Sequence, residues 1–231
     1  GGGLYNACWG KGSGGAGENM PHITNCLFDS NRSYDKDGGA IYNFFSDAVI
    51  SGCEFEDNRS YLAGGAVSNN TSIVEIDSCT FTLNESSHNS GGAINSYLGS
   101  LRLFNSAIED NRSQMMGGGI NNLATALIMN CTINGNSSSY GGGIATGVGN
   151  NEDSTIVKNC KIYNNTADQY GGGVHNYVTD HFLISEFINC IIYGNSATTG
   201  GGAFSYHEGS GTSNFIKIGR ASCRERVYCE V

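Results

Sequence analysis

Proline is almost absent from this 231-residue sequence, with Pro21 as its only example, although glycine occurs 35 times. A disordered glycine-rich chain would usually be rich in proline as well and poor in large apolar residues. Here apolar residues make up 39% of the chain, close to the level of ordinary globular proteins. The sequence therefore predicts an ordered fold, and the chain is long enough to bury a large core.

Basic residues and long apolar runs are also scarce. The chain has 12 Lys and Arg residues against 21 Asp and Glu residues, which gives a formal net charge of −9. Nucleic acids and anionic membrane surfaces attract basic patches, so this balance argues against both as partners. No apolar run approaches the roughly 18 residues of a membrane-spanning helix, so we expect no membrane insertion by this segment.

What the sequence does contain is an internal repeat. A motif of two glycines, a third Gly or Ala and an apolar residue recurs every 24–30 residues from Gly38 onward. Its copies begin at Gly1, Gly38, Gly64, Gly91, Gly117, Gly141, Gly171 and Gly201. A second motif, Cys-x-apolar-x-x-Asn, runs in step with it and ends at Asn31, Asn58, Asn84, Asn111, Asn136, Asn165 and Asn195. Two motifs in step over seven copies predict a stack of similar coils.

Three apolar columns recur within the repeat and predict three short strands per coil. The first column stands three residues before the Cys, at Ile23, Ile50, Ile76, Leu103, Ile128, Val157 and Phe187. The second stands two residues after it, at Phe28, Phe55, Phe81, Ile108, Ile133, Ile162 and Ile192. The third follows the glycines, at Ile41, Val67, Ile94, Ile120, Ile144, Val174 and Phe204. The period of two slips by one just before the Cys, where Asn, Gly or Ser tolerates a sharp bend.

Stacking such coils puts each strand beside its own copy, so the sheets are parallel. We therefore predict an all-β fold, a right-handed parallel β-helix of about seven coils of 24–30 residues, over residues 1–218. The sequence opens inside a repeat without Met or a signal-peptide pattern, so we expect a fragment of a longer protein. Residues 219–231 carry no repeat motif and form either a non-native extension, which we favour, or a polar cap on the last coil.

The repeated Asn and Cys residues have structural interpretations. Each Asn should stack on its copies as an amide ladder that satisfies its own hydrogen bonds. The cysteines of the repeat should form an inward column of free thiols: Cys26, Cys53, Cys79, Cys131, Cys160 and Cys190. One Cys per coil does not supply the tetrahedral set that a metal site needs, so we expect no metal ion and no cofactor.

The motifs resemble those of a known family. "GGAI" at 38–41 and 91–94, "GGAV" at 64–67, and "FDSN", "FEDN" and "FTLN" ending at Asn31, Asn58 and Asn84 are similar to the repeats of chlamydial polymorphic outer membrane proteins. The later coils change to "GGGI" or "GGGV" with "INGN", "IYNN" and "IYGN", and are closer to the β-helix repeat regions of bacterial surface proteins in general. The resemblance implies a passenger-like rod, secreted or at the cell surface, that is often adhesive.

These observations favour a non-enzymatic, extracellular or cell-surface module that acts as an adhesin or as a spacer. Its expected partners are glycans or proteins on the surface of a host or neighbouring cell, and we expect a monomer. Acidic pairs such as Glu56–Asp57 and Glu109–Asp110 are interpreted as solvated edge charges. Arg32, Arg59, Glu85 and Arg112 share one repeat position and should form an exposed row of ion pairs.

The alternative is a carbohydrate-active enzyme, a polysaccharide lyase or glycoside hydrolase, acting on one face of the β-helix. Loops around 147–154 and 177–182 fall in neighbouring coils, and they supply the catalytic candidates Asp153, Asp180 and His181. His175 and His207, beside Tyr177 and Tyr206, form the most site-like surface of the sequence, because imidazole and aromatic groups suit contact with sugars.

Overall fold

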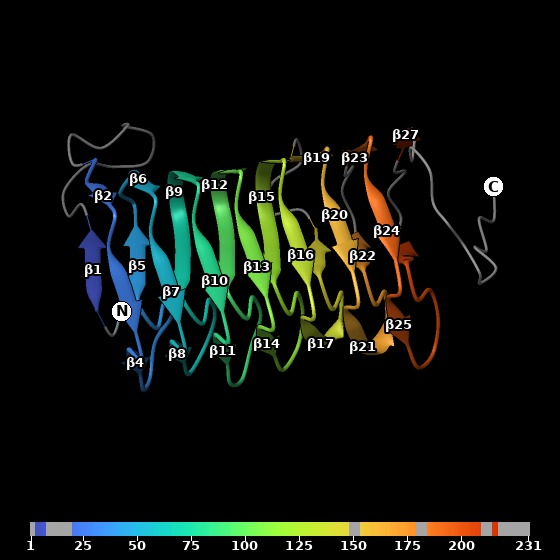
Figure 1. Cartoon of the computed structure of the whole chain (residues 1–231), viewed down its shortest axis with the longest axis horizontal. Coiled ribbons are helices and arrows are strands. Elements are labelled where there is room, and N and C mark those ends of the chain that lie inside the picture. Colours follow the sequence, from blue (N-terminus) through green and yellow to red (C-terminus); the bar gives the residue numbers. More distant parts are fainter. Residues whose placement is uncertain (1–2, 8–19, 148–152, 179–183, 209–213, 217–231) are drawn as a thin grey trace.

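The fold is a stack of parallel coils made of strands. The structure is a computed structural model that describes residues 3–7, 20–147, 153–178, 184–208 and 214–216. Within these ranges there are three sheets and no helix, and every strand pair is parallel. Figure 1 shows the coils side by side along a rod, in the order of the sequence. The predicted parallel β-helix with three sheets is confirmed.

The first sheet is the widest, with 13 strands. Its glycine-side half consists of the segments that follow the glycines: β1 (Leu4–Ala7), β5 (Ile41–Phe44), β18 (Ile144–Thr146), β22 (Val174–Val178) and β26 (Phe204–Glu208). Its cysteine-side half consists of the segments that precede the Cys: β2 (His22–Thr24), β6 (Ala48–Ser51), β19 (Ser154–Lys158), β23 (Ile184–Ile188) and β27 (Asn214–Ile216). Three long strands run through both halves: β9 (Val67–Asp77), β12 (Ile94–Phe104) and β15 (Ile120–Met129).

The second and third sheets have seven strands each. The second sheet follows the Cys position: β3 (Leu27–Asp29), β7 (Glu54–Glu56), β10 (Thr80–Thr82), β13 (Ala107–Glu109), β16 (Thr132–Asn134), β20 (Lys161–Tyr163) and β24 (Ile191–Tyr193). The third follows the ladder Asn: β4 (Arg32–Ser33), β8 (Arg59–Ser60), β11 (Glu85–Ser86), β14 (Arg112–Ser113), β17 (Ser137–Tyr140), β21 (Thr166–Tyr170) and β25 (Ser196–Ala197).

This assignment of strands to sheets differs from the prediction in one respect. The segments after the glycines and before the Cys belong to one sheet, because the chain continues through β9, β12 and β15 without leaving it. The third sheet is instead formed by the two to five residues after the Asn, which were predicted only as an exposed row. The Asn therefore lies at the bend between the second and third sheets.

The predicted bend before the Cys is confirmed by its backbone. Asn25, Gly52, Ser78, Asn105, Asn130, Asn159 and Asn189 all have φ between 48° and 62°. The residue before each ladder Asn repeats this geometry, with φ between 47° and 67° at Ser30, Asp57, Leu83, Asp110, Gly135, Asn164 and Gly194. This left-handed conformation turns the chain sharply and is tolerated best by Gly, Asn and Asp. The turn before the Cys separates the first sheet from the second, and the turn before the ladder Asn separates the second sheet from the third.

The core is formed by the three predicted apolar columns. Ile50, Ile76, Phe81 and Ile94 are completely buried. The rings of Phe28, Phe55 and Phe81 stack in successive coils, with centroids 4.9 and 4.6 Å apart. Each buried side chain thus packs on its own copy in the next coil, which is why the repeat preserves size as well as polarity at these positions.

The ladder asparagines from Asn58 onward are buried in the same interior, and Asn31 is half-buried. From Asn31 to Asn195, each side-chain Nδ2 donates to the Oδ1 atom of the next ladder Asn at 2.9–3.0 Å. The backbone N–H of each Asn also donates to that same Oδ1 atom. The predicted amide ladder is confirmed.

In the part of the chain that the structure describes, no helix has the length and apolar character needed to span a membrane.

Candidate functional site

The catalytic candidates of the enzyme hypothesis are only partly placed. Asp153 is 5% exposed, and its Oδ1 atom accepts a hydrogen bond of 3.3 Å from the Thr125 hydroxyl. Asp180 and His181 lie outside the described residues. The one candidate that is described is therefore an almost buried carboxylate on the cysteine-side half of the first sheet.

His175 is also buried rather than presented to solvent. It is 3% exposed, and its Nδ1 atom lies 2.7 Å from the hydroxyl oxygen of Ser205 in the next coil. Its ring lies 5.5 Å from that of Tyr140 and 6.4 Å from that of Tyr177. The side chains of Tyr206 and His207 lie outside the described part. The predicted site-like surface thus contains a histidine, but a histidine that packs beneath tyrosine rings.

Charged residues of the third sheet, such as Arg32, Arg59 and Glu85, are partly exposed. Arg59 and Glu85 form an ion pair of 2.8 Å between neighbouring coils, as the predicted row requires. Arg32 instead bonds the Asp57 carboxylate at 2.7 Å across the bend. Both pairs are partly exposed and contribute little to stability. Within the described ranges, no group of three or more His, Cys, Asp and Glu side chains is placed to hold a metal ion.

The six repeat cysteines are free thiols. All except Cys26 are buried, and their Sγ atoms accept the backbone N–H of the preceding Cys position in several coils, as from Cys53 to Cys79 at 3.4 Å. Burial raises the pKa of the Cys79 thiol to about 11, because a thiolate loses its hydration there. Burial likewise raises the pKa of Cys53. Cys53 and Cys79 are therefore core groups rather than reactive nucleophiles.

A different surface stands out on the glycine-side half of the first sheet. Its outward positions from β1 to β22 hold no Lys, Arg, Asp or Glu. Instead they carry large rings together with amides and small residues: Tyr5, Tyr42, Phe44, Ser68, Asn70, Asn95, Tyr97, Asn121, Leu123, Ala145, His175 and Tyr177. Alternation along the strand turns these side chains to the outer side of the sheet, although Ser68, Asn95, Asn121, Ala145 and His175 are buried there.

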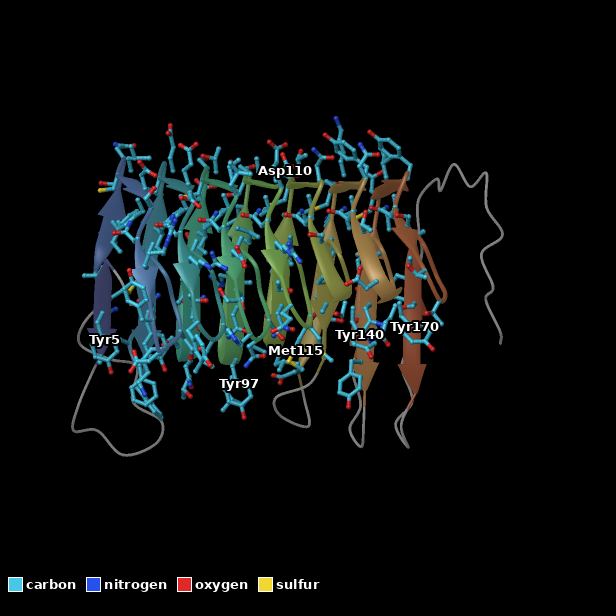
Figure 2. All side chains as sticks on the ribbon, turned by 90° about the horizontal axis from the view of Figure 1, so that it is seen from below. Tyr5, Tyr97, Asp110, Met115, Tyr140 and Tyr170 are labelled. Carbon is cyan, nitrogen blue, oxygen red and sulfur yellow. The ribbon has the colours of Figure 1, made fainter. Side chains whose placement is uncertain are left out.

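The segment just before the glycines adds Met115, and Tyr140 and Tyr170 at the ends of β17 and β21, to this surface. Figure 2 shows Tyr5, Tyr97, Met115, Tyr140 and Tyr170 along one side of the rod, with Asp110 on the other. We call these five residues, with Tyr42, Phe44, Phe45 and Tyr177, the aromatic stripe. Among its members Tyr5 is 49% exposed, Tyr97 42% and Tyr170 39%.

Ring contacts hold parts of the stripe together. At its first end, the ring of Tyr42 lies 5.5 Å from that of Tyr5 and 6.0 Å from that of Phe44. At its other end, the rings of Tyr140 and Tyr170 are stacked 6.1 Å apart, and the Tyr140 hydroxyl bonds Gln169 at 2.7 Å. Rings fixed in this way lose little conformational entropy when a ligand binds. The stripe is thus a preformed, uncharged contact surface.

Sequence reasoning named Tyr177 and His175 but not the rest of the stripe. The signal was present in the sequence, since the residues one and three positions after each inward residue of the third column are uncharged in every described coil. It was missed because the strand after the glycines was treated only as a source of core residues.

The architecture and the repeat define a β-helix repeat protein. A family model described as the Chlamydia polymorphic membrane protein repeat matches residues 25–43. This span contains Cys26, the first ladder residue Asn31 and the glycines before Ile41. No curated protein and no solved structure gives a significant match to the chain. The chain is therefore similar to a polymorphic membrane protein repeat region, which suggests a protein related to the cell surface or outer membrane.

Proposed function

We propose that this segment is a non-enzymatic β-helix module displayed outside the cell or at its surface, where it acts as an adhesive, passenger-like rod. The observation that carries the proposal is the aromatic stripe, which combines exposed rings with an absence of charge over successive coils. A module serving only as a spacer would need the rod but not the stripe.

Display at a surface is supported by the repeat and by the contacts that connect successive coils in the interior. The family match at residues 25–43 belongs to a membrane protein repeat of bacterial type. The amide ladder and the apolar columns connect each coil to its neighbours through hydrogen bonds and packing. Such a rod extends a contact surface away from whatever carries it.

The chemistry of the stripe favours a neutral glycan on a host or neighbouring cell as the partner. Tyrosine combines an apolar ring face with a polar tip, which suits the C–H faces and hydroxyl groups of a sugar. The amides of Asn70 and Gln169 lie beside these rings and provide donors and acceptors. A charged glycan or a strongly charged protein would find no opposite charges at the outward positions of this half from β1 to β22.

The buried position of Asp153 gives little support to a carbohydrate-active enzyme, because a general acid or base must reach the scissile bond. The enzyme hypothesis is nevertheless tested by the same experiment. The protein is incubated with a panel of neutral and acidic polysaccharides in the presence of calcium, and both binding and the release of new sugar ends are measured.

Tyr97→Ser and Tyr193→Ser form a matched pair for this experiment. Both tyrosines are similarly exposed, 42% and 41%, but Tyr193 lies on the second sheet. We expect Tyr97→Ser to weaken glycan binding several-fold, which is the effect of losing one stacked ring, and Tyr193→Ser to leave it unchanged. Equal effects of the two changes would exclude the stripe as the contact surface. If the protein releases new sugar ends and Asp153→Asn abolishes this release, the adhesin proposal is wrong and the enzyme hypothesis replaces it.

A further inference from the structure

A second amide column runs through the interior, parallel to the ladder described above. It occupies the inward position two residues after the third apolar column, on the glycine-side half of the first sheet. Asn6 donates to Asn43 at 3.1 Å, and Asn43 donates to Asn69 at 2.9 Å, each from Nδ2 to Oδ1. All three residues are buried. The column has the same polarity as the main ladder, with each amide donating to the following coil.

The column is interrupted at the next coil, where Ser96 pairs in register with Asn69 on one side and Asn122 on the other. Serine carries a hydroxyl group where an asparagine carries a carboxamide, so its side chain is too short to continue the column. Ser96, Asn69 and Asn122 are each 0% exposed, so bulk solvent does not reach this place.

Three buried polar atoms meet the interruption without a hydrogen-bond partner among the described residues: Asn69 Nδ2, Ser96 Oγ and Asn122 Oδ1. The amide orientations are fixed by other contacts. Asn69 Oδ1 accepts from Asn43, and Asn122 Nδ2 donates to the Ala124 carbonyl at 2.6 Å and to Thr155 Oγ1 at 3.1 Å. A donor therefore faces the Ser96 rung from one side and an acceptor faces it from the other.

We propose that the Ser96 rung is a binding site for buried water, which accepts from Asn69 Nδ2, donates toward Asn122 Oδ1 and bonds the Ser96 hydroxyl. A cation is disfavoured by the amide donor and an anion by the amide oxygen, whereas water both donates and accepts. The size difference between a serine and an asparagine side chain is close to one water molecule. Buried waters typically make about three hydrogen bonds, the number of free groups here.

Bound water in this rung leaves and enters only when the surrounding coils open, so it exchanges slowly with solvent. The water is thus an internal ligand of the fold, and it completes the column that begins at Asn6. It is independent of the proposed function, because it lies inside the sheet whose outer side carries the stripe.

Two structures test the proposal. A high-resolution crystal structure of the protein should show density within hydrogen-bonding distance of Asn69 Nδ2 and Ser96 Oγ. In Ser96→Asn, the new amide should displace this density and join Asn69 to Asn122. Dry, directly paired side chains at this rung in the unmodified protein would overturn the proposal.

Thermal unfolding provides the second readout. Ser96→Asn should raise the unfolding midpoint by about 2–4 °C, the shift expected for one net hydrogen bond in a chain of this size. Ser100→Asn, on the outward side of the same strand β12, is the matched control and should leave the midpoint unchanged. Ser96→Ala should lower the midpoint, because the water loses one partner; a midpoint above that of the unmodified protein would contradict a hydrated rung.

Discussion

The Nδ2 atom of Asn84 lies 2.9 Å from Oδ1 of Asn111, one coil further along the chain, and 3.0 Å from the carbonyl oxygen of Phe55, one coil back. Both amide hydrogens of Asn84 are therefore used, and they connect three coils. Since Asn58, Asn111, Asn136 and Asn165 repeat this arrangement, the ladder is a continuous chain of hydrogen bonds rather than a series of pairs.

The first prediction concerns this ladder. Asn111→Ala removes the acceptor of the Asn84 N–H groups and the donor to the Phe81 carbonyl, all of them buried. We expect a loss of about 2–4 kcal/mol in the free energy of unfolding, since each unsatisfied buried group costs about 1–3 kcal/mol. Denaturant unfolding measures it. Asn134→Ala, half-buried on the outer side of the second sheet, is the control, and a similar loss for both would refute the importance of the ladder.

The second prediction concerns the glycine corner. A Cβ atom on Gly65 would lie 2.0 Å from the carbonyl oxygen of Gly92 and 2.6 Å from the backbone nitrogen of Glu85. Neither backbone atom can move without separating coils, so Gly65→Ala should cost about 3 kcal/mol or more. On Gly200 the nearest heavy atom would be 3.5 Å away in the Tyr170 ring, and Gly200→Ala should change stability by less than about 0.5 kcal/mol. Denaturant unfolding curves of the two variants measure both changes in stability, and equal losses would contradict the prediction.

The third prediction concerns alkaline pH. Burial raises the pKa of the Cys79 thiol from 9.0 to about 11, so the folded protein keeps the proton that the unfolded chain releases first. The stability contributed by this group is fully present below pH 9 and is lost as the pH rises from 9 through 11. Cys79→Ala should reduce this alkaline loss, because it removes the thiol whose pKa is raised in the folded protein. An unchanged pH profile for Cys79→Ala would show that other groups cause it.

The fourth prediction concerns thiol reactivity. Cys26 is exposed, whereas the other described cysteines, Cys53, Cys79, Cys131, Cys160 and Cys190, are buried. In a background with Cys8, Cys223 and Cys229 replaced by Ser, a thiol reagent at pH 8 should label one cysteine rapidly. The remaining five should react only in denaturant. Mass spectrometry after timed quenching identifies the sites, and rapid labelling of a second position would disprove the burial of the column.

Much of this fold could be predicted from the sequence because the information repeats. An apolar residue such as Ile76 is weak information alone, but the same residue type at the same offset in seven coils identifies an inward column. The bend before the Cys could be predicted as well, since Asn105, Asn130, Asn159 and Asn189 are residues that adopt positive φ at low cost.

The division into sheets could not be predicted in the same way. Short strands such as Arg59–Ser60 are too brief to show a period of two, and their pairing becomes visible only when the coils are stacked. The burial of some outward residues could not be predicted from the sequence either. His175 lies on the outward side of its strand, yet it is buried, and the ring of Tyr140 at the end of β17 packs against it.

One further pattern was in the sequence but was not recognised. The amides at the bend before the Cys form a ladder of their own on the surface, from Asn189 through Asn159 and Asn130 to Asn105, which donates to Asp77 at 2.7 Å. Tolerance of a bend explained these residues individually, and that explanation concealed the contacts between them.

The register of the coils has an evolutionary consequence. Glu54 and Ala107 each pair with Thr80, from opposite sides, so the coil between them is enclosed by two equivalent surfaces. Loss of the segment from Arg59 to Asn84 by recombination would place the amide of Asn58 against that of Asn111 and restore the same type of contact at every rung. Duplication of the segment would add one coil and would again give the same type of contact at every rung. The length of the rod can therefore change by a whole coil without a change in the type of contact at any rung.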